Sequence, residues 1–341
     1  MGSEMCIRDR WLSTYLTDFA AQSGHFCPRC YQRETILYGH NPQGSQRVQC
    51  RSCKHVWTPK QQPLTTIVPP EQIATVPLIV PFQGACTDQK LYVLLSFDAI
   101  RGNILHISSN FTPHLVGDTL RYRWRNNVEP AVIHDNIVER VRQRETLFLR
   151  RSQFDEIQYG SAMLKRNANG AVLRPVITAH GHFRILSHLW PEVKTHIIAH
   201  ECFLRGAAIT AWAQQYRDHH ASLWFIDEEI TSDKCTLPWR LLGKTWQGWW
   251  RNQWQIWQQG DTRKMVCLLT EGQVEKGASI TLAAGHHFLA WLQQQAEFRD
   301  SARYSAHSVF QTIRTLAEQY NTLITQRDLP GGAAAYRAYD S

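Results

Sequence analysis

The chain of 341 residues lacks several features that would narrow its class at once. No stretch approaches twenty uninterrupted apolar residues, the length that a membrane-spanning helix needs, so the sequence predicts no membrane partner. It also lacks a recognisable secretory signal, so we expect a cytoplasmic protein whose cysteines are reduced. Charged residues make up only 19% of the chain and hydrophobic residues 43%, which is typical of a soluble globular protein. The length allows two domains.

The charge and the cysteines indicate what kinds of partner to expect. The formal net charge of +8 favours polyanionic partners, with nucleic acid first among them. Nine cysteines are present, and four of them form two C-x-x-C pairs. We expect the paired cysteines to bind a metal and the scattered ones to be small buried side chains.

The first ten residues, "MGSEMCIRDR", match an in-frame translation of a sequencing-library adapter read from a GTG start. We therefore expect residues 1–10 not to be native and leave them out of fold reasoning, as one does with a tag. Residues 11–24 are predicted to form a short helix.

The two cysteine pairs have the spacing of a zinc ribbon. Nineteen residues separate Cys27-x2-Cys30 from Cys50-x2-Cys53, and the intervening segment is typical of a strand, a turn and a second strand. Zinc favours four thiolates in a tetrahedron, and each pair supplies two. A site with four cysteines has no open position, so the predicted zinc in residues 25–58 is structural.

The residues around these cysteines resemble the N-terminal zinc ribbon of bacterial insertion-sequence transposases. The resemblance rests on "CPRC", on Tyr38-Gly39 and on "GSQRVQCRSCKHVWT", about a tenth of the chain. It implies DNA binding, with basic side chains as candidate phosphate contacts: Arg29, Arg33, Arg47, Arg51 and Lys54. These transposases usually continue with a helix-turn-helix, whereas this chain has a proline-rich segment over residues 59–89, which we expect to be an extended linker.

The remaining segments mix strand and helix patterns, which predicts an α/β or α+β core over residues 90–235. Residues 91–109 are predicted to form a β-hairpin, residues 131–151 a helix, and residues 153–190 three strands. A strand, a helix and a strand follow over residues 194–231. Residues 236–330 are expected to be a mainly helical, tryptophan-rich region, and residues 331–341 a loose tail.

Insertion-sequence transposases carry an RNase H-like domain, whose fold the resemblance implies for the large domain. Their two-metal chemistry needs three carboxylates, from the first strand, the end of the fourth strand and a later helix. The candidates to hold Mg²⁺ are Asp98, Asp155 and Glu228. In a second alignment Asp155 is the first carboxylate and Glu201 the second, and the sequence does not choose between the two.

The histidines and the tryptophans can each be interpreted as functional or as structural residues. His180, His182, His188, His196 and His200 could form a second metal site, but the favoured interpretation is that they are scattered packing or surface histidines. The tryptophans between residues 246 and 257 recur at helical spacing. They could stack on the bases of single-stranded or distorted DNA beside Lys244 and Arg251, or they could pack against the core.

Three functions remain open. The first is a transposase-like enzyme that binds DNA and catalyses metal-dependent strand cleavage and transfer. The second is a domesticated or degenerate relative that binds nucleic acid without catalysis. The third is an adaptor that docks other proteins through its zinc ribbon, and a homo-oligomer is compatible with each.

Overall fold

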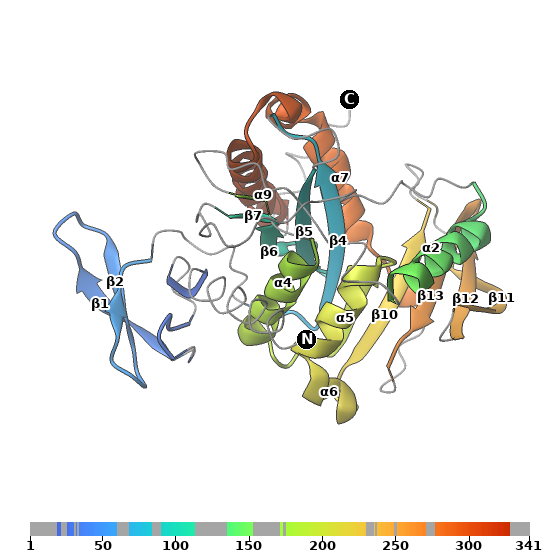
Figure 1. Cartoon of the computed structure of the whole chain (residues 1–341), viewed down its shortest axis with the longest axis horizontal. Coiled ribbons are helices and arrows are strands. Elements are labelled where there is room, and N and C mark those ends of the chain that lie inside the picture. Colours follow the sequence, from blue (N-terminus) through green and yellow to red (C-terminus); the bar gives the residue numbers. More distant parts are fainter. Residues whose placement is uncertain are drawn as a thin grey trace.

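The computed structural model describes most of the chain (Figure 1). The described residues are 19–21, 26–30, 32, 34–59, 68–83, 90–112, 135–152, 171–172, 175–229, 235, 237–248, 251–270 and 277–327. Within these ranges, no helix is long and apolar enough to cross a membrane. The predicted helix at 11–24 and the tail at 331–341 lie largely or wholly outside them, as do residues 153–170.

A small three-stranded antiparallel sheet carries the cysteines. It consists of β1 (Thr35–His40), β2 (Gln46–Cys50) and β3 (Val56–Trp57), in the order β1-β2-β3. The turn between β1 and β2 is closed by the side chain of Asn41, which accepts a hydrogen bond from the backbone of Ser45 at 2.7 Å. The strand, turn and strand expected between the cysteine pairs are confirmed.

An eight-stranded mixed sheet forms the large body of the protein, in the order β11-β12-β13-β10-β9-β4-β5-β6. Its first half contains β4 (Gln72–Val80), β5 (Leu91–Asp98), β6 (Ile104–Ser109) and β9 (Thr195–Ala199). Its second half contains β10 (Ser222–Glu228), β11 (Arg240–Gln247), β12 (Asn252–Gln259) and β13 (Thr262–Leu268). The strands β7 (Phe111–Thr112) and β8 (Ala171–Val172) form a separate pair.

Five strands of this sheet have the topology that the resemblance implies. β4, β5 and β6 are consecutive antiparallel neighbours, and β9 then pairs parallel to β4 and β10 parallel to β9. If these strands are numbered one to five along the chain, their order across the sheet is 3-2-1-4-5, which is that of an RNase H-like core. β4 therefore occupies the place of the first strand and β9 that of the fourth.

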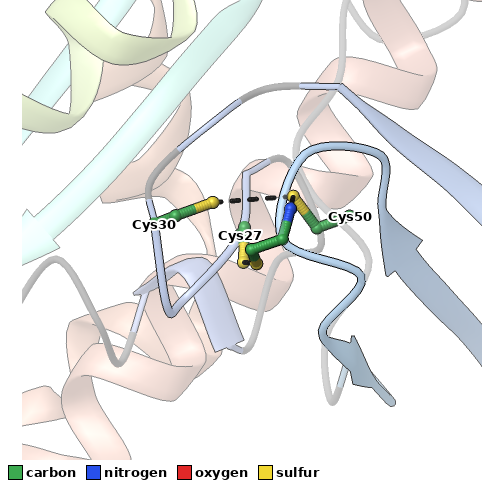
Figure 2. A group of neighbouring side chains, drawn as sticks. Cys27, Cys30 and Cys50 are labelled. Carbon is green, nitrogen blue, oxygen red and sulfur yellow. Dashed lines mark hydrogen bonds between the residues drawn. The ribbon is translucent and has the colours of Figure 1, made fainter.

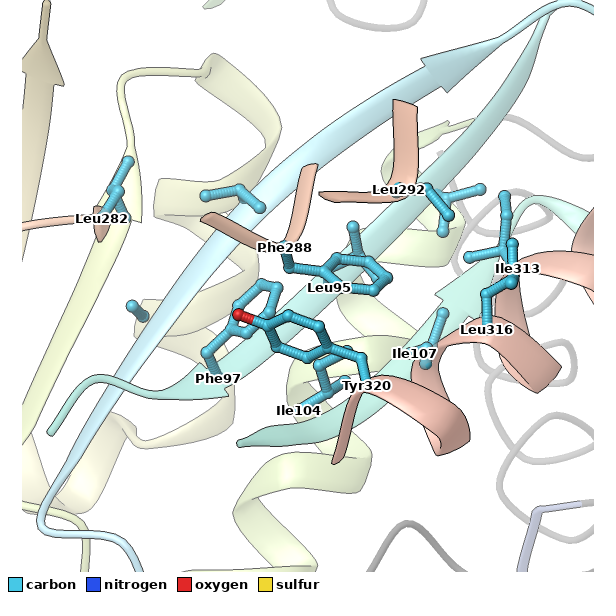
Figure 3. Close-up of a cluster of buried hydrophobic side chains, with 14 of the residues drawn as sticks. Leu95, Phe97, Ile104, Ile107, Leu282, Phe288, Leu292, Ile313, Leu316 and Tyr320 are labelled. Atoms are coloured by element: carbon cyan, nitrogen blue, oxygen red, sulfur yellow. The ribbon is translucent and has the colours of Figure 1, made fainter. Parts of the chain in front are cut away.

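Helices cover both faces of the sheet, so the domain has three layers. On one face, α7 (Ala283–Gln294) and α9 (Ala306–Arg327) pack on β4, β5 and β6, with Phe288 and Tyr320 between them (Figure 3). The other face is covered by α2 (Ile137–Ser152), α4 (Pro175–Leu189), α5 (Cys202–Ala211) and α6 (Ala213–Arg217). Short turns complete the C-terminal region: η1 (Gly277–Ser279), α8 (Ala296–Arg299) and η2 (Ser301–Arg303).

The proline-rich linker expected over residues 59–89 contains the central strand β4, and this part of the prediction is wrong. β4 pairs with β5 along Ile73 to Val80, but its parallel pairing with β9 ends at Thr75. Pro77 therefore sits where a ladder runs on one side only, a position that tolerates the missing N–H. Pro70 precedes the strand and Pro81 follows it.

Two further segments were predicted with the wrong secondary structure. Residues 175–189 form α4 rather than strands, because Ala179, Phe183 and Leu186 recur at helical spacing and pack on the sheet. Arg240–Gln247 and Asn252–Gln259, predicted as part of one helix, form the paired strands β11 and β12. Gly248, with a φ of +79°, supplies the left-handed residue at the turn between them, and strand pairing overrides the helical spacing of the tryptophans.

Candidate functional site

The four paired cysteines converge on one point. Their sulfurs all lie within 4.8 Å of one another, and Cys27 Sγ is 3.5 Å from Cys53 Sγ. Cys30 Sγ is 3.6 Å from Cys50 Sγ, and Figure 2 shows these two side chains pointing toward each other beside Cys27. A tetrahedral zinc with Zn–S bonds of about 2.3 Å places its sulfurs roughly 3.8 Å apart. The spacing and the donor set therefore fit zinc, and all four cysteines are free of disulfides.

Backbone N–H groups point at the sulfurs and favour thiolates. Arg29 N–H donates to Cys27 Sγ at 3.3 Å, and Cys53 N–H donates to Cys50 Sγ at 3.5 Å. Burial works to raise the pKa of the Cys50 thiol, but the N–H groups of Cys53 and Ser52 and the side chain of Cys30 bring that pKa to about 7. Burial raises the pKa of Cys27 to about 12 when no ion is present. A bound cation would stabilise both thiolates.

The described basic side chains predicted to contact phosphate, Arg29, Arg47, Arg51 and Lys54, lie close to the cysteines along the chain. Arg29, Arg51 and Lys54 are exposed, and Arg33 lies outside the described residues. Arg47 is partly buried, and its guanidinium lies 5.5 Å from the ring centroid of Tyr38. The zinc ribbon therefore presents at least three unburied cations and one exposed aromatic ring to solvent.

Phe26 joins the zinc ribbon to the large domain. Its side chain is fully buried and packs with Ile185 and Leu189 of α4. Its ring also lies 5.5 Å from that of His188. The first cysteine of the cluster is thus held one residue from an anchor on the core.

Asp98 ends β5, as predicted, but its carboxylate is occupied within the turn that follows. Oδ1 accepts hydrogen bonds from the backbone N–H groups of Ile100 and Arg101, both at 2.9 Å. Oδ2 pairs with the guanidinium of Arg101 at 2.7 Å, and Asp98 itself is fully buried. These contacts close the β5–β6 hairpin.

Glu228 is bound to the start of α7. Its carboxylate accepts hydrogen bonds from Leu282 N–H at 2.8 Å and from Thr281 Oγ1 at 3.1 Å, and it lies 3.0 Å from His286 Nδ1. A carboxylate at this position satisfies the unpaired N–H groups of a helix and complements its dipole. Glu228 therefore fixes α7 on the sheet.

Glu201 follows β9 and accepts a hydrogen bond from Tyr92 Oη at 3.0 Å. Asp98 lies level with His196, because both residues pair with Ile73 of β4. Five residues separate His196 from Glu201, so Asp98 and Glu201 lie roughly 16 Å apart along the strand direction. The structure does not bring Asp98, Glu201 and Glu228 into one group that could hold a metal ion. Asp155 lies outside the described residues.

The three carboxylates that the resemblance implies would lie on the first strand, after the fourth strand and on a later helix. The first strand, β4, contains no Asp or Glu along its whole length, and neither does α7, the first long helix after the sheet. A Cβ on Gly285 of α7 would lie 2.8 Å from Val76 Cγ1 of β4, so hydrocarbon fills the contact between these two elements. Glu201 is a carboxylate at the expected place after the fourth strand, β9.

A buried charged cluster beneath α2 was not predicted. Arg140 Nε and Arg144 Nη1 contact the carboxylate of Asp227 on β10 at 2.8 and 2.6 Å. Beside them, Glu145 Oε1 lies 3.2 Å from His200 Nε2. The spacing of Arg140 and Arg144, four residues apart on one helix face, was the available signal. The cluster anchors α2 over the ends of β9 and β10.

His182, His196 and His200 are buried in the core, whereas His180 and His188 are only partly buried. His182 is fully buried, with Nε2 2.7 Å from Ser96 Oγ and Nδ1 2.7 Å from Ser108 Oγ. Burial lowers the pKa of His182 to about 3, and that of His196 likewise, so both are neutral at pH 7. Within the described part of the chain, the four cysteines are the one group that could hold a metal ion.

Comparison with known proteins gives little. No family model matches the chain, and no curated protein does. A cryo-EM structure of a piggyBac transposase synaptic complex with hairpin DNA aligns with 75% of this chain at 8% identity and a TM-score of 0.27. The chain spans 47% of that transposase's length. At such an identity and TM-score, the alignment indicates nothing about what this chain binds.

Proposed function

We propose that this protein binds DNA through its zinc ribbon and that its RNase H-like core does not cut it. The observation that carries the proposal is the contrast between two sets of side chains. Four thiolates converge in a geometry that fits zinc, whereas the first strand and the helix α7 lack the carboxylates that a two-metal centre needs.

DNA is the proposed partner because cations line the zinc ribbon and the whole chain carries a net charge of +8. Arg29, Arg51 and Lys54 are exposed around the cysteines and would contact phosphates. The resemblance of this module to the zinc ribbons of insertion-sequence transposases supports the same partner. Zinc would hold the two knuckles together and take no part in chemistry.

The proposal is tested by salt-dependent binding and by a nicking assay on one preparation. We expect the logarithm of the affinity for a DNA duplex to fall linearly with the logarithm of the salt concentration, because each phosphate contact releases counterions. We expect no nicking of supercoiled plasmid with Mg²⁺ or Mn²⁺. Salt-independent association would favour the protein adaptor instead.

Nicking by the wild-type protein that Asp98→Asn, Asp155→Asn or Glu228→Gln abolishes would overturn the non-catalytic part of the proposal. It would establish metal-dependent strand cleavage and leave DNA binding intact. The two parts can therefore fail separately.

A further inference from the structure

The hairpin β11–β12 at the outer end of the sheet has two unlike faces. On the face toward α2, Trp254 is fully buried; its ring stacks on Phe225 at 6.3 Å and contacts His200 edge-on at 4.7 Å. On the opposite face, Trp246 is 61% exposed. Figure 1 shows β11 and β12 at the end of the sheet remote from the zinc ribbon.

Four side chains share the open face because of the strand register. Lys244 lies directly opposite Gln255, and Trp246 directly opposite Gln253. Residues two apart on one strand share a face, so these four form one surface, which we call the hairpin patch. Lys244, Trp246 and Gln253 are exposed, and Gln255 is partly buried with its Oε1 accepting a hydrogen bond from Trp257 Nε1.

The charged residues of the hairpin itself are all basic, and a carboxylate that contacts it, that of buried Glu145, accepts a hydrogen bond from Asn252 Nδ2 on the α2 side. Residues 237–259 contain no Asp or Glu. Arg240, Lys244 and Arg251 are all exposed, and none of them forms an ion pair with another described residue. Unpaired cations next to an exposed indole and amide side chains suit a polyanion that also carries flat rings.

We propose that the hairpin patch binds single-stranded nucleic acid, separately from the zinc ribbon. Trp246 stacks on a base, Lys244 lies near the backbone phosphates, and the amide of Gln253 reaches a base edge. The inference rests on the proposed nucleic-acid function and extends it to a second surface. A duplex fits less well, since its bases are already stacked and cannot cover an exposed indole ring.

A second copy of the chain is a poorer occupant of this edge. The pairing of β11 with β12 shifts register between Leu241 and Gly243, and such a bulge, together with Arg240 and Lys244, opposes edge-to-edge pairing. The other edge of the sheet is closed differently. There, Asn321 of α9 accepts a hydrogen bond from Ile104 N–H at 2.7 Å and donates to Ile104 O at 2.8 Å.

The experiment compares fluorescence anisotropy of a labelled oligothymidylate of about 15 nucleotides, a length that one such surface can hold, with that of a labelled duplex. Trp246→Ala should weaken oligothymidylate binding roughly 5- to 150-fold, because stacking on one aromatic ring has that effect. Trp246→Phe should keep most of the affinity, and Lys244→Gln should lower the salt dependence. Tyr304→Ala is the matched control, since Tyr304 is a 49% exposed aromatic outside the hairpin patch.

Duplex binding separates this inference from the proposed function. Arg51→Ala and Lys54→Ala in the zinc ribbon should weaken duplex binding, and Trp246→Ala should not. If Trp246→Ala leaves oligothymidylate binding unchanged while the ribbon variants lose duplex binding, the inference is overturned and the proposed function stands. If the wild type is a dimer and Trp246→Ala is a monomer with the same oligothymidylate affinity, the inference is overturned and the hairpin patch contacts a second copy of the chain instead. If the wild type binds neither probe, both fail.

Discussion

The cysteine thiols of the zinc ribbon and the carboxylates of the large domain are arranged in opposite ways. In the zinc ribbon, two short knuckles bring four thiols within 4.8 Å of one another and leave their sulfurs directed at a common centre. In the large domain, each candidate carboxylate among the described residues is already bound by its own surroundings: Asp98 by the β5–β6 turn, Glu228 by α7 and Glu201 by Tyr92. Convergence marks a ligand site, whereas local hydrogen bonding marks a structural role.

The largest effect is expected when one of the four thiols is removed, because zinc binding by the zinc ribbon depends on all of them. Cys50→Ser is expected to abolish stoichiometric zinc binding and unfold the zinc ribbon, because a structural zinc contributes on the order of 10 kcal/mol to the folding of such a module. Zinc content by mass spectrometry and the dispersion of ribbon amide resonances check this. Cys235→Ser, outside the cluster, should retain one zinc per chain. Full zinc content in Cys50→Ser would show that the four thiols do not form one zinc site, and the contrast with the carboxylates would be lost.

Acid should weaken the core through its neutral histidines. The pKa of buried His182 is about 3, below the value of about 6.5 in an unfolded chain, so the unfolded state binds the proton more readily. Its contribution to stability is therefore complete above pH 6.5 and is lost as the pH falls from 6.5 toward 3. Urea unfolding between pH 8 and 4 should show a falling midpoint. In His182→Gln, with Ser96 and Ser108 still present, that fall should be shallower; an unchanged slope would assign it to other groups.

Substitutions at Asp98 and Glu201 should lower the free energy of unfolding by different amounts, and neither should affect a reaction. Asp98→Ala removes a fully buried carboxylate with three contacts, so we expect a loss of about 2 to 3 kcal/mol in the free energy of unfolding. Glu201→Gln keeps an acceptor for Tyr92 and should cost under about 0.5 kcal/mol. Chemical denaturation measures both. Equal stability together with loss of bound Mn²⁺ would instead identify Asp98 as a metal ligand.

The smallest effect is expected from a single cation of the zinc ribbon. Arg51→Ala should weaken duplex binding uniformly across sequences and reduce the slope of log affinity against log salt by about one, since one phosphate contact is lost. Titrations at several salt concentrations measure the slope. Gln49→Ala is the matched control, since Gln49 is an uncharged residue of β2 two positions before Arg51. A slope that stays the same would remove Arg51 from the contact surface.

Some of the fold could be predicted because its determinants are local. The hairpin of β5 and β6, the strand β9, the helix α5 and the strand β10 each carry their pattern within one segment. β4 was not predicted, because the prolines at residues 77 and 81 indicated a linker even though residues 73–80 are largely apolar. The end of pairing with β9 at Thr75 is what makes Pro77 acceptable, and that is a property of the sheet.

The tryptophans show the same limit. Helical spacing predicted one apolar face, but Gly248 turns the chain and places Trp246 and Trp254 on opposite faces of a hairpin. No periodicity within the segment could separate the exposed ring from the buried one. The separation depends on α2, which covers only the face that carries Trp254.

The sequence by itself determined the cysteine cluster, because two tight knuckles and one hairpin supply every ligand within 27 residues of chain. The positions of the carboxylates relative to one another were decided only by the tertiary structure. Strands that are distant in sequence had to pair before Asp98 could be placed level with His196 rather than beside Glu201. Cysteine spacing acts over a few residues, whereas a site shared between strands depends on register across the whole sheet.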